Sequence, residues 1–350
     1  MDRPLISVII PCYNAQDTLE AAVYSALDQG VKEIEVIIVD DGSTDWSFVK
    51  AHMIADAEPR VRVIAMATNS GPSLARNKGI EEARGSYITF LDADDIYSEG
   101  LFKKIKKLVA GKYDVITWGA LEEYIDADGH ISRTRQLTHK DTPLESEAAV
   151  RGRVLDLEEL SLYGYLWNKA YRAELIKDIK IPVQTFNEDE MFNIEVFNHV
   201  GSAYILDFAG THYRKGAAGS LTSSELFDYY PLAMKRVAGL MNQQKAWGLY
   251  DDAAERRIAD IYLRYMLSAI ERTYHPALGN NERTRLLFMQ RVFCSKLYQE
   301  MERAFAPGNP VLRHLAAALR DKDAAAALKV GKHIYKLKMN FPTLFEKLKG

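Results

Sequence analysis

The strongest constraint on the fold is an alternation of short β-branched runs with helix-patterned segments over residues 1–95. Runs rich in Ile and Val that end in Pro, Gly or Asp are typical of buried strands, and apolar residues three and four positions apart are typical of helices. The predicted strands cover residues 5–10, 34–39, 62–65 and 87–91. The predicted helices cover residues 15–29 and 73–83. This alternation predicts an α/β fold with a mostly parallel sheet flanked by helices on both faces.

Polar clusters follow three of the predicted strands. They occupy residues 11–14, 40–45 and 92–95. Ligands of open parallel sheets bind outside the carboxyl ends of the strands, so we expect these clusters to line a ligand site.

The last of these clusters places two carboxylates close together. Asp92 and Asp94 project to the same side if the geometry of the preceding strand continues. Like charges repel, and a divalent cation with oxygen ligands, Mg²⁺ or Mn²⁺, would relieve that repulsion. An Asx-rich turn without a ligand is the alternative interpretation. Because Asp95 follows Asp94 directly, the sequence leaves open which of the two would bind the metal.

The other polar residues allow two interpretations each. A carboxylate within residues 40–45 can accept a hydrogen bond from a base edge or a ribose hydroxyl, and the alternative is a turn with a helix cap. Arg76 can pair with a phosphate or can lie on a solvated helix face.

Composition excludes several classes of protein. The net charge of −3, from 45 Lys and Arg against 48 Asp and Glu, gives no overall attraction for nucleic acid. Cys12 and Cys294 match neither a zinc spacing nor a disulfide framework. No apolar run approaches the roughly 18 residues of a membrane span. We therefore expect a soluble, cytoplasmic protein without a nucleic-acid partner, and contact with a membrane surface stays open.

The patterning changes near residue 221, which predicts two regions. Residues 1–220 form the predicted catalytic domain, and residues 221–350 are mainly helix-patterned. The end of the chain, residues 329–350, is rich in Lys and carries apolar and aromatic residues. Such a segment can contact an anionic membrane surface, or it can pack on the catalytic domain or on a second subunit of a homodimer.

Taken together, the motifs resemble the family 2 glycosyltransferases of the GT-A fold, a class that builds bacterial surface polysaccharides. The segments that carry the resemblance are VIIPCYN at residues 8–14, VDDGSTD at 39–45, GPSLARNKG at 71–79 and FLDADD at 90–95. Their order and spacing match the family over about the first 100 residues. The resemblance implies a donor half over about residues 1–95 and an acceptor half over about residues 96–220.

The resemblance also implies roles for particular residues. Asp189, in the segment FNEDEMF at residues 186–192, would be the catalytic base. The implied metal ligands are Asp94, Asp92 and His212. The implied donor contacts are Pro11, Tyr13, Asn14, Asp41, Asn69, Arg76, Asp92, Arg214 and Ser220. The implied acceptor contacts are Trp167, Lys169 and Glu188. Trp167 as a core residue and His212 as a structural histidine are the alternatives.

The expected function is that of an inverting glycosyltransferase that depends on Mn²⁺ or Mg²⁺. It would move a hexose or N-acetylhexosamine from a UDP-sugar to a hydroxyl of a saccharide or lipid-linked saccharide. Asp41 accepting from the N3 hydrogen of the base favours uridine, although thymidine presents the same donor. The alternatives are a catalytically inactive sugar-nucleotide-binding subunit and a sugar-phosphate nucleotidyltransferase, whose Gly-rich amino-terminal loop is replaced here by residues 11–14.

Overall fold

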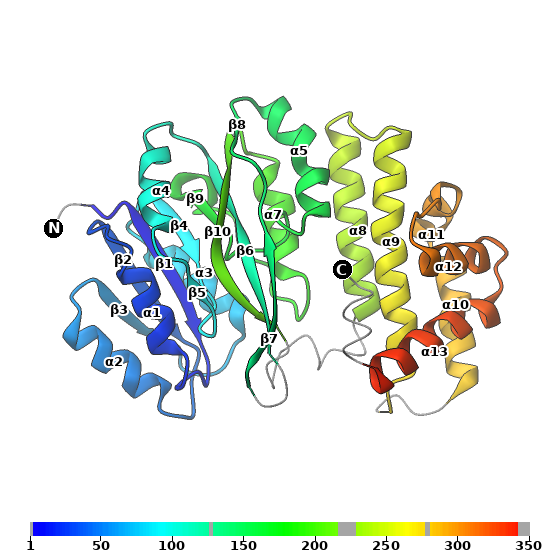
Figure 1. Ribbon diagram of the computed structural model, residues 1–350, viewed down its shortest axis with the longest axis horizontal. Coiled ribbons are helices and arrows are strands. Elements are labelled where there is room, and N and C mark those ends of the chain that lie inside the picture. The colour runs from blue at the N-terminus through cyan, green and yellow to red at the C-terminus, as the bar shows by residue number, and fades with distance from the viewer. Residues whose placement is uncertain (1–2, 126–128, 216–228, 277–280, 342–350) are drawn as a thin grey trace. The chain divides into compact units, whose positions relative to one another are not determined.

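The computed structural model describes residues 3–125, 129–215, 229–276 and 281–341. Its contacts divide the chain into two units, Met1–Ser220 and Leu221–Gly350. The first unit is a sheet flanked by helices, and the described part of the second consists of helices (Figure 1).

The first unit is built on a single mixed sheet. Its strands are β1 (Ile6–Cys12), β2 (Ile34–Asp40), β3 (Val61–Ala65), β4 (Tyr87–Phe90), β5 (Ile96–Tyr97), β6 (Val115–Ile125), β7 (Ile131–Leu137), β8 (Thr142–Leu144), β9 (Lys169–Arg172) and β10 (Ala203–Lys215). Its helices are α1 (Leu19–Leu27), α2 (Ser47–Ala57), α3 (Pro72–Glu82), α4 (Leu101–Val109), α5 (Glu147–Glu159), α6 (Ala173–Ile176) and α7 (Glu188–Phe197). The strand order is β3-β2-β1-β4-β9-β6-β10-β5, with β7 paired to β6 and β8 to β10.

The predicted α/β fold with flanking helices is confirmed, and the strand pairing adds detail to it. Strands β1 to β4 are parallel to one another, as predicted. Strand β9 runs antiparallel between β4 and β6, and β6 pairs in parallel with β10. The sheet is therefore parallel in its donor half and mixed beyond it.

Burial explains why the first strands are continuous apolar runs. Every residue of β2 is buried, and so is every residue of β1 except Pro11, because helices cover both faces. Helix α3 approaches β1 closely at Gly79, where an added Cβ would lie 2.4 Å from the Cγ2 of Ile9. Only a residue without a side chain allows that contact.

Strand β10 contains irregularities that matter for the site. Its parallel register with β6 shifts between Leu206 and Ala209 and again between Ala209 and Thr211. Beyond the shifts, His212 pairs with Leu121 and Arg214 with Glu123. Extra residues on one strand bend it and change which side chains face the partner.

The second unit packs around one long helix. Its elements are α8 (Tyr229–Ala246), α9 (Asp252–Arg272), α10 (Glu282–Cys294), α11 (Lys296–Met301), η3 (Glu302–Ala304), α12 (Pro310–Arg320) and α13 (Ala324–Asn340). Helix α9 begins at an Asp251 cap and buries Tyr262, Met266 and Ala269. Within the described residues, no helix combines the length and apolar character that crossing a membrane requires.

Candidate active site

The polar clusters meet at the carboxyl edge of the sheet because β1 lies between β2 and β4. Cys12 pairs with Asp40 and Ile9 with Phe90, so the residues that follow these strands leave the sheet side by side. The three clusters therefore share one edge of the sheet, and their role as a ligand site stays a prediction.

Asp41 holds the loop that leads into α3. Its buried carboxylate accepts hydrogen bonds from the backbone N–H groups of Ser70, at 2.8 Å, and Gly71, at 2.7 Å. Gly71 has a φ of 91°, in the left-handed region that favours glycine. Each carboxylate oxygen can accept a further bond, so the predicted contact with a uracil base stays compatible with this arrangement.

Several other predicted donor residues lie in β1, directly after it, or in the loop that leads into α3. Tyr13 is 46% exposed, which leaves its ring available for a base. Asn14 Oδ1 accepts from the N–H of Thr44 at 2.8 Å, and Asn69 Oδ1 accepts from the N–H of Gly71 at 3.2 Å. Pro11 lies in β1, and Ser220 lies outside the described residues.

Arg76 joins two segments that are far apart in the sequence. Its Nη2 lies 2.8 Å from Asp92 Oδ1, and its Nη1 lies 3.2 Å from Glu188 Oε1 and 3.1 Å from Asp189 Oδ1. Burial opposes the guanidinium charge, but the three carboxylates outweigh it and raise the pKa of Arg76. Its Nε is buried without a hydrogen-bond partner in the described part of the chain. The solvated-face alternative is therefore wrong, and a phosphate contact stays a prediction.

Asp189 occupies the first turn of α7, in a strongly acidic setting. Burial raises its pKa well above the usual range, Arg76 opposes that shift, and Glu188 adds to it. A carboxylate with a raised pKa is a better proton acceptor than an exposed one, which suits a general base. Glu188 pairs with Arg76, so its predicted acceptor contact would have to coexist with that ion pair.

The three aspartates after β4 differ in their surroundings. Asp94 is exposed, whereas Asp95 is buried and accepts from the backbone N–H of Arg214 at 3.2 Å. The other carboxylate oxygen of Asp95 has no hydrogen-bond partner among the described residues. Desolvation by surrounding atoms and the charge of Asp92 raise the pKa values of both Asp94 and Asp95, and Asp94 adds further to the shift of Asp95.

Such a cluster is short of positive charge, so it fits a divalent cation with oxygen ligands. No three His, Cys, Asp or Glu side chains in the described ranges are gathered into a ready metal site. A cation here would therefore need ligands from a bound molecule as well. The exposure of Asp94 favours it over Asp95 as the residue that reaches such a cation.

Two adjacent acids that the sequence analysis missed hold the end of β10. Glu123 Oε1 lies 2.7 Å from His212 Nδ1, and Glu123 Oε2 lies 3.6 Å from Arg214 Nε. Glu122 forms an ion pair with Lys215. The available signal was two consecutive acids inside an otherwise apolar strand, but it does not by itself point to partners on β10.

Trp167 is 3% exposed and stacks on Tyr165, with ring centroids 4.7 Å apart and an interplanar angle of 25°. The ring of Tyr213 lies 5.2 Å away and is tilted by 31°. Aromatic neighbours thus cover the indole, and the structure favours the core alternative for Trp167 over a sugar platform.

The predicted acceptor contact of Lys169 is wrong in this structure. Its side chain is fully buried, and Nζ donates to Leu162 O at 2.7 Å, Tyr165 O at 2.6 Å and Asn168 Oδ1 at 2.8 Å. An ammonium has three donors, so none is left for an acceptor sugar. Burial lowers the pKa of Lys169 to about 7.

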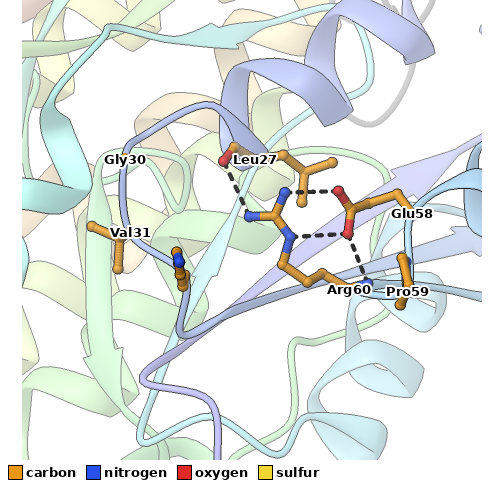
Figure 2. A pocket seen from close by; sticks show the side chains of 7 residues that line it. Leu27, Gly30, Val31, Glu58, Pro59 and Arg60 are labelled. Atoms are coloured by element: carbon orange, nitrogen blue, oxygen red, sulfur yellow. Dashed lines mark hydrogen bonds and ion pairs between the residues drawn. The ribbon is translucent and has the colours of Figure 1, made fainter.

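A pocket of about 550 Å³ lies elsewhere, at the amino ends of β2 and β3. Its polar groups are bonded to one another: Arg60 Nη2 donates to Glu58 Oε2 at 2.7 Å, and Arg60 Nη1 donates to Leu27 O at 3.3 Å (Figure 2). This pocket is at the opposite edge from the polar clusters, so it is not the site that they form.

Comparison with known proteins agrees with the motifs. Residues 7–179 match the profile of glycosyl transferase family 2. The chain is 48% identical over 213 residues to the uncharacterized glycosyltransferase YibD of Escherichia coli, which is 57% of this chain and 58% of YibD. It is 31% identical over 216 residues to the uncharacterized glycosyltransferase EpsJ of Bacillus subtilis, which is 61% of each chain.

The first relatives are matched over less than two thirds of their own length, for example 48% of a Haemophilus influenzae glycosyltransferase that is 43% identical over 119 residues. Among solved structures, the S. aureus TarS fragment 1–349 in complex with UDP-GlcNAc has a TM-score of 0.67 and 21% sequence identity. The match covers 96% of this chain and 92% of that one. This likeness shows a shared fold.

Proposed function

Because residues 7–179 place this chain in glycosyl transferase family 2, with a GT-A fold, we propose that it transfers a sugar from a nucleotide donor to a hydroxyl group. The donor would be a UDP-hexose or UDP-N-acetylhexosamine. The acceptor would be a saccharide or lipid-linked saccharide of a bacterial surface polysaccharide.

The observation that carries this proposal is the position of Arg76. It contacts Asp92 at one end and Asp189 at the other, so it joins the predicted donor side to the predicted base. A transferase needs the acceptor oxygen and the anomeric carbon within about 3–3.5 Å of each other. Arg76 and Asp189 are 113 positions apart in the sequence, and the fold brings their side chains within 3.1 Å, which supports a site with the donor and the base close together.

The residues suggest an inverting mechanism. Asp189 would remove the proton of the acceptor hydroxyl while that oxygen attacks the anomeric carbon from the face opposite the diphosphate. The bond to the diphosphate oxygen breaks in the same step, so the configuration at the carbon inverts. Arg214, 38% exposed, would stabilise the charge on the departing diphosphate.

A divalent cation would be held by Asp94, Asp92 and His212 together with oxygens of the bound diphosphate, because these three side chains alone are not gathered into a metal site, and it would neutralise charge on the diphosphate. The fit rests on the surplus of carboxylates and on the oxygen of Asp95 that has no partner among the described residues. Asp41 and Tyr13 would bind the uracil. The donor class is supported by the TarS fragment, which shares the fold and was crystallised with UDP-GlcNAc and with UDP.

The test separates chemistry from binding. Asp189→Asn keeps the shape of the side chain but removes the base, so transfer should fall about 10²- to 10⁴-fold. The dissociation constant for UDP, measured by titration calorimetry, should stay within about threefold of the parent value. Asp178→Asn, an exposed position in the same unit, is the matched control and should leave both quantities unchanged.

Two results would contradict the proposal. Loss of UDP binding in Asp189→Asn would assign Asp189 to the donor site instead of the reaction. Absence of transfer and of donor hydrolysis in the parent protein, with UDP still bound, would favour the inactive sugar-nucleotide-binding subunit. Proton NMR of the product tests inversion, because a retained anomeric configuration would exclude the single displacement.

Contact with a membrane surface is a further part of the proposal. Lys329, Lys332 and Lys336 are exposed and follow one another at helical spacing along α13. A basic face of this kind is attracted to anionic lipid, where a lipid-linked acceptor would be found. The alternatives of packing and of a homodimer interface stay open for the residues of the tail beyond 341, which lie outside the described residues.

A further inference from the structure

Strands β6 and β10 lie side by side in the first unit (Figure 1). Two buried carboxylates of β6 contact side chains near the end of β10. Glu122 and Glu123 are 3% and 6% exposed, which is rare for glutamates that have no partner. Their partners are Lys215, His212 and Arg214, all on the last four residues of β10. A buried charge is costly unless it is paired, so each of these contacts restricts the position of a β10 side chain.

The contact between Glu123 and His212 also fixes the protonation pattern of the imidazole. A carboxylate only accepts, so His212 Nδ1 must donate across the 2.7 Å separation. In the neutral ring Nε2 then carries the lone pair, which is the form that binds a metal ion. The His212 side chain is 27% exposed, so the ring is not sealed in the core.

Backbone contacts connect His212 and Arg214 to the acidic loop. His212 pairs with Ile96 of β5, the residue after Asp95, and Arg214 donates its N–H to Asp95. The end of β10 is thus fastened to Glu123 on one side and to the aspartate loop on the other.

We propose that Glu123 is a positioning residue for the metal and the diphosphate. It holds His212 in the tautomer with a free Nε2, and it holds the guanidinium of Arg214 nearby. This inference rests on the proposed function, in which His212 and Arg214 contact the metal and the leaving group. Glu122 has no such role, because its partner Lys215 is not among the residues proposed to contact the metal or the leaving group.

A purely structural role is the competing explanation, since the same contacts would also join β6 to β10. The two roles predict different effects of a Glu123 substitution on metal affinity, depending on whether His212 is present. If Glu123 acts through the imidazole, its effect on metal affinity disappears when the imidazole is absent. If it only stabilises the strands, its effect is the same with or without His212.

The experiment is a double-mutant cycle with Mn²⁺ as the probe. The variants are Glu123→Gln, His212→Ala and the pair combined, and Mn²⁺ affinity in the presence of UDP is followed by electron paramagnetic resonance. Glu123→Gln keeps the size of the side chain but can donate as well as accept, so it no longer selects one tautomer. Loss of such an outer partner typically weakens metal binding about 10- to 100-fold.

The matched control is Glu195→Gln. Glu195 of α7 also contacts a histidine, His199 at 3.3 Å just after the helix, but both side chains are more than half exposed. Thermal unfolding of each variant shows that it is folded. We expect weakened Mn²⁺ binding in Glu123→Gln, unchanged binding in Glu195→Gln, and no further loss when Glu123→Gln is added to His212→Ala.

The outcomes separate the two proposals. Parent-like Mn²⁺ affinity in Glu123→Gln, or an equal additional loss in the His212→Ala background, would overturn the positioning role while leaving the proposed function intact. Absence of UDP-dependent Mn²⁺ binding in the parent protein would overturn the metal part of the proposed function and this inference with it.

Discussion

At the scale of single residues, the site is dominated by carboxylates that share few cations. Arg76 pairs with three of them at once, and Glu123 contacts both His212 and Arg214 of β10. Asp95 is the least satisfied, because it is buried with one oxygen unpartnered in the described part of the chain. Functional residues of this kind often lower the stability of the fold, so substituting them should raise the free energy of unfolding while activity is lost.

Asp95→Asn should stabilise the protein in metal-free buffer at pH 7.5. The pKa of Asp95 is raised in the folded protein. Above that pKa the buried carboxylate is ionised and destabilises the fold, whereas below it the protonated carboxyl carries no such penalty. The amide keeps an oxygen for the N–H of Arg214 and carries no charge, so the free energy of unfolding should rise at pH 7.5. Urea unfolding at pH 7.5 and pH 4 checks this, because the gain should vanish at the lower pH.

The exposed neighbour provides the contrast. Asp94→Asn should change the free energy of unfolding by less than about 0.5 kcal/mol, yet it should abolish metal-dependent transfer. If Asp95→Asn destabilises the protein and Asp94→Asn leaves transfer intact, the two aspartates have been assigned the wrong way round.

Lys169 should make stability rise with pH. Its folded pKa is lowered to about 7 from the ordinary value of 10.5, so between those values the unfolded chain binds the extra proton. The free energy of unfolding of the parent, minus that of Lys169→Met, should therefore increase by up to about 1.4 kcal/mol per pH unit from pH 7 to pH 10.

Urea unfolding at pH 7, 8 and 9 measures that difference, and Lys180→Met, an exposed lysine of the same unit, should show no such trend. A flat difference for Lys169→Met would mean that the three hydrogen bonds to Nζ keep the lysine protonated in the fold.

At the scale of elements, the sequence predicted the individual strands of the first half of the sheet but not how distant strands pair. The strands predicted over residues 5–10, 34–39, 62–65 and 87–91 agree with β1 to β4 within two residues, because β-branched runs and their closing turns are local signals. The antiparallel insertion of β9 between β4 and β6 could not be predicted, because pairing depends on contacts between distant segments. Glu123 was missed for the same reason, since its partners lie 89 and more positions away on β10.

Helix α3 offers a test of packing at this scale. Gly79→Ala places a methyl group 2.4 Å from Ile9 Cγ2, so it should lower the free energy of unfolding by about 1–3 kcal/mol. Gly152→Ala, in α5, meets nothing within 4 Å and should instead raise it by about 0.5–1 kcal/mol. Urea unfolding of both variants decides, and a neutral or stabilising Gly79→Ala would mean that α3 can move away from β1.

At the scale of the whole molecule, the residues of the candidate site that the structure describes all lie in the first unit, and the exposed lysines of α13 lie in the second. We therefore hypothesise that the first unit carries the reaction and that the second unit contacts the membrane. This hypothesis predicts that changes in α13 alter membrane binding without altering UDP affinity.

The triple variant Lys329→Glu, Lys332→Glu and Lys336→Glu should lose co-sedimentation with vesicles that contain anionic lipid. Each lysine near such a surface contributes about 1 kcal/mol, so removing three weakens binding by roughly 100-fold before the added repulsion is counted. The control reverses three exposed lysines of α4, Lys103, Lys104 and Lys107, which changes the net charge equally. Equal loss in both variants, or no sedimentation of the parent at low salt, would remove α13 as a membrane contact.

The register shifts of β10 also constrain how this chain tolerates changes in length. Between Leu206 and Thr211 the strand advances five positions while its partner β6 advances two, from Trp118 to Ala120. Three surplus residues are an odd number, so the alternation of side chains is inverted relative to an unbroken ladder. Deleting one residue within positions 207–210 would move each following side chain to the opposite face of the sheet. Tyr213 would then occupy the position where His212 now meets Glu123. A deletion there should therefore eliminate activity even where the protein still folds, whereas the same change in a surface loop should be harmless. Insertions and deletions in this short stretch should consequently be selected against.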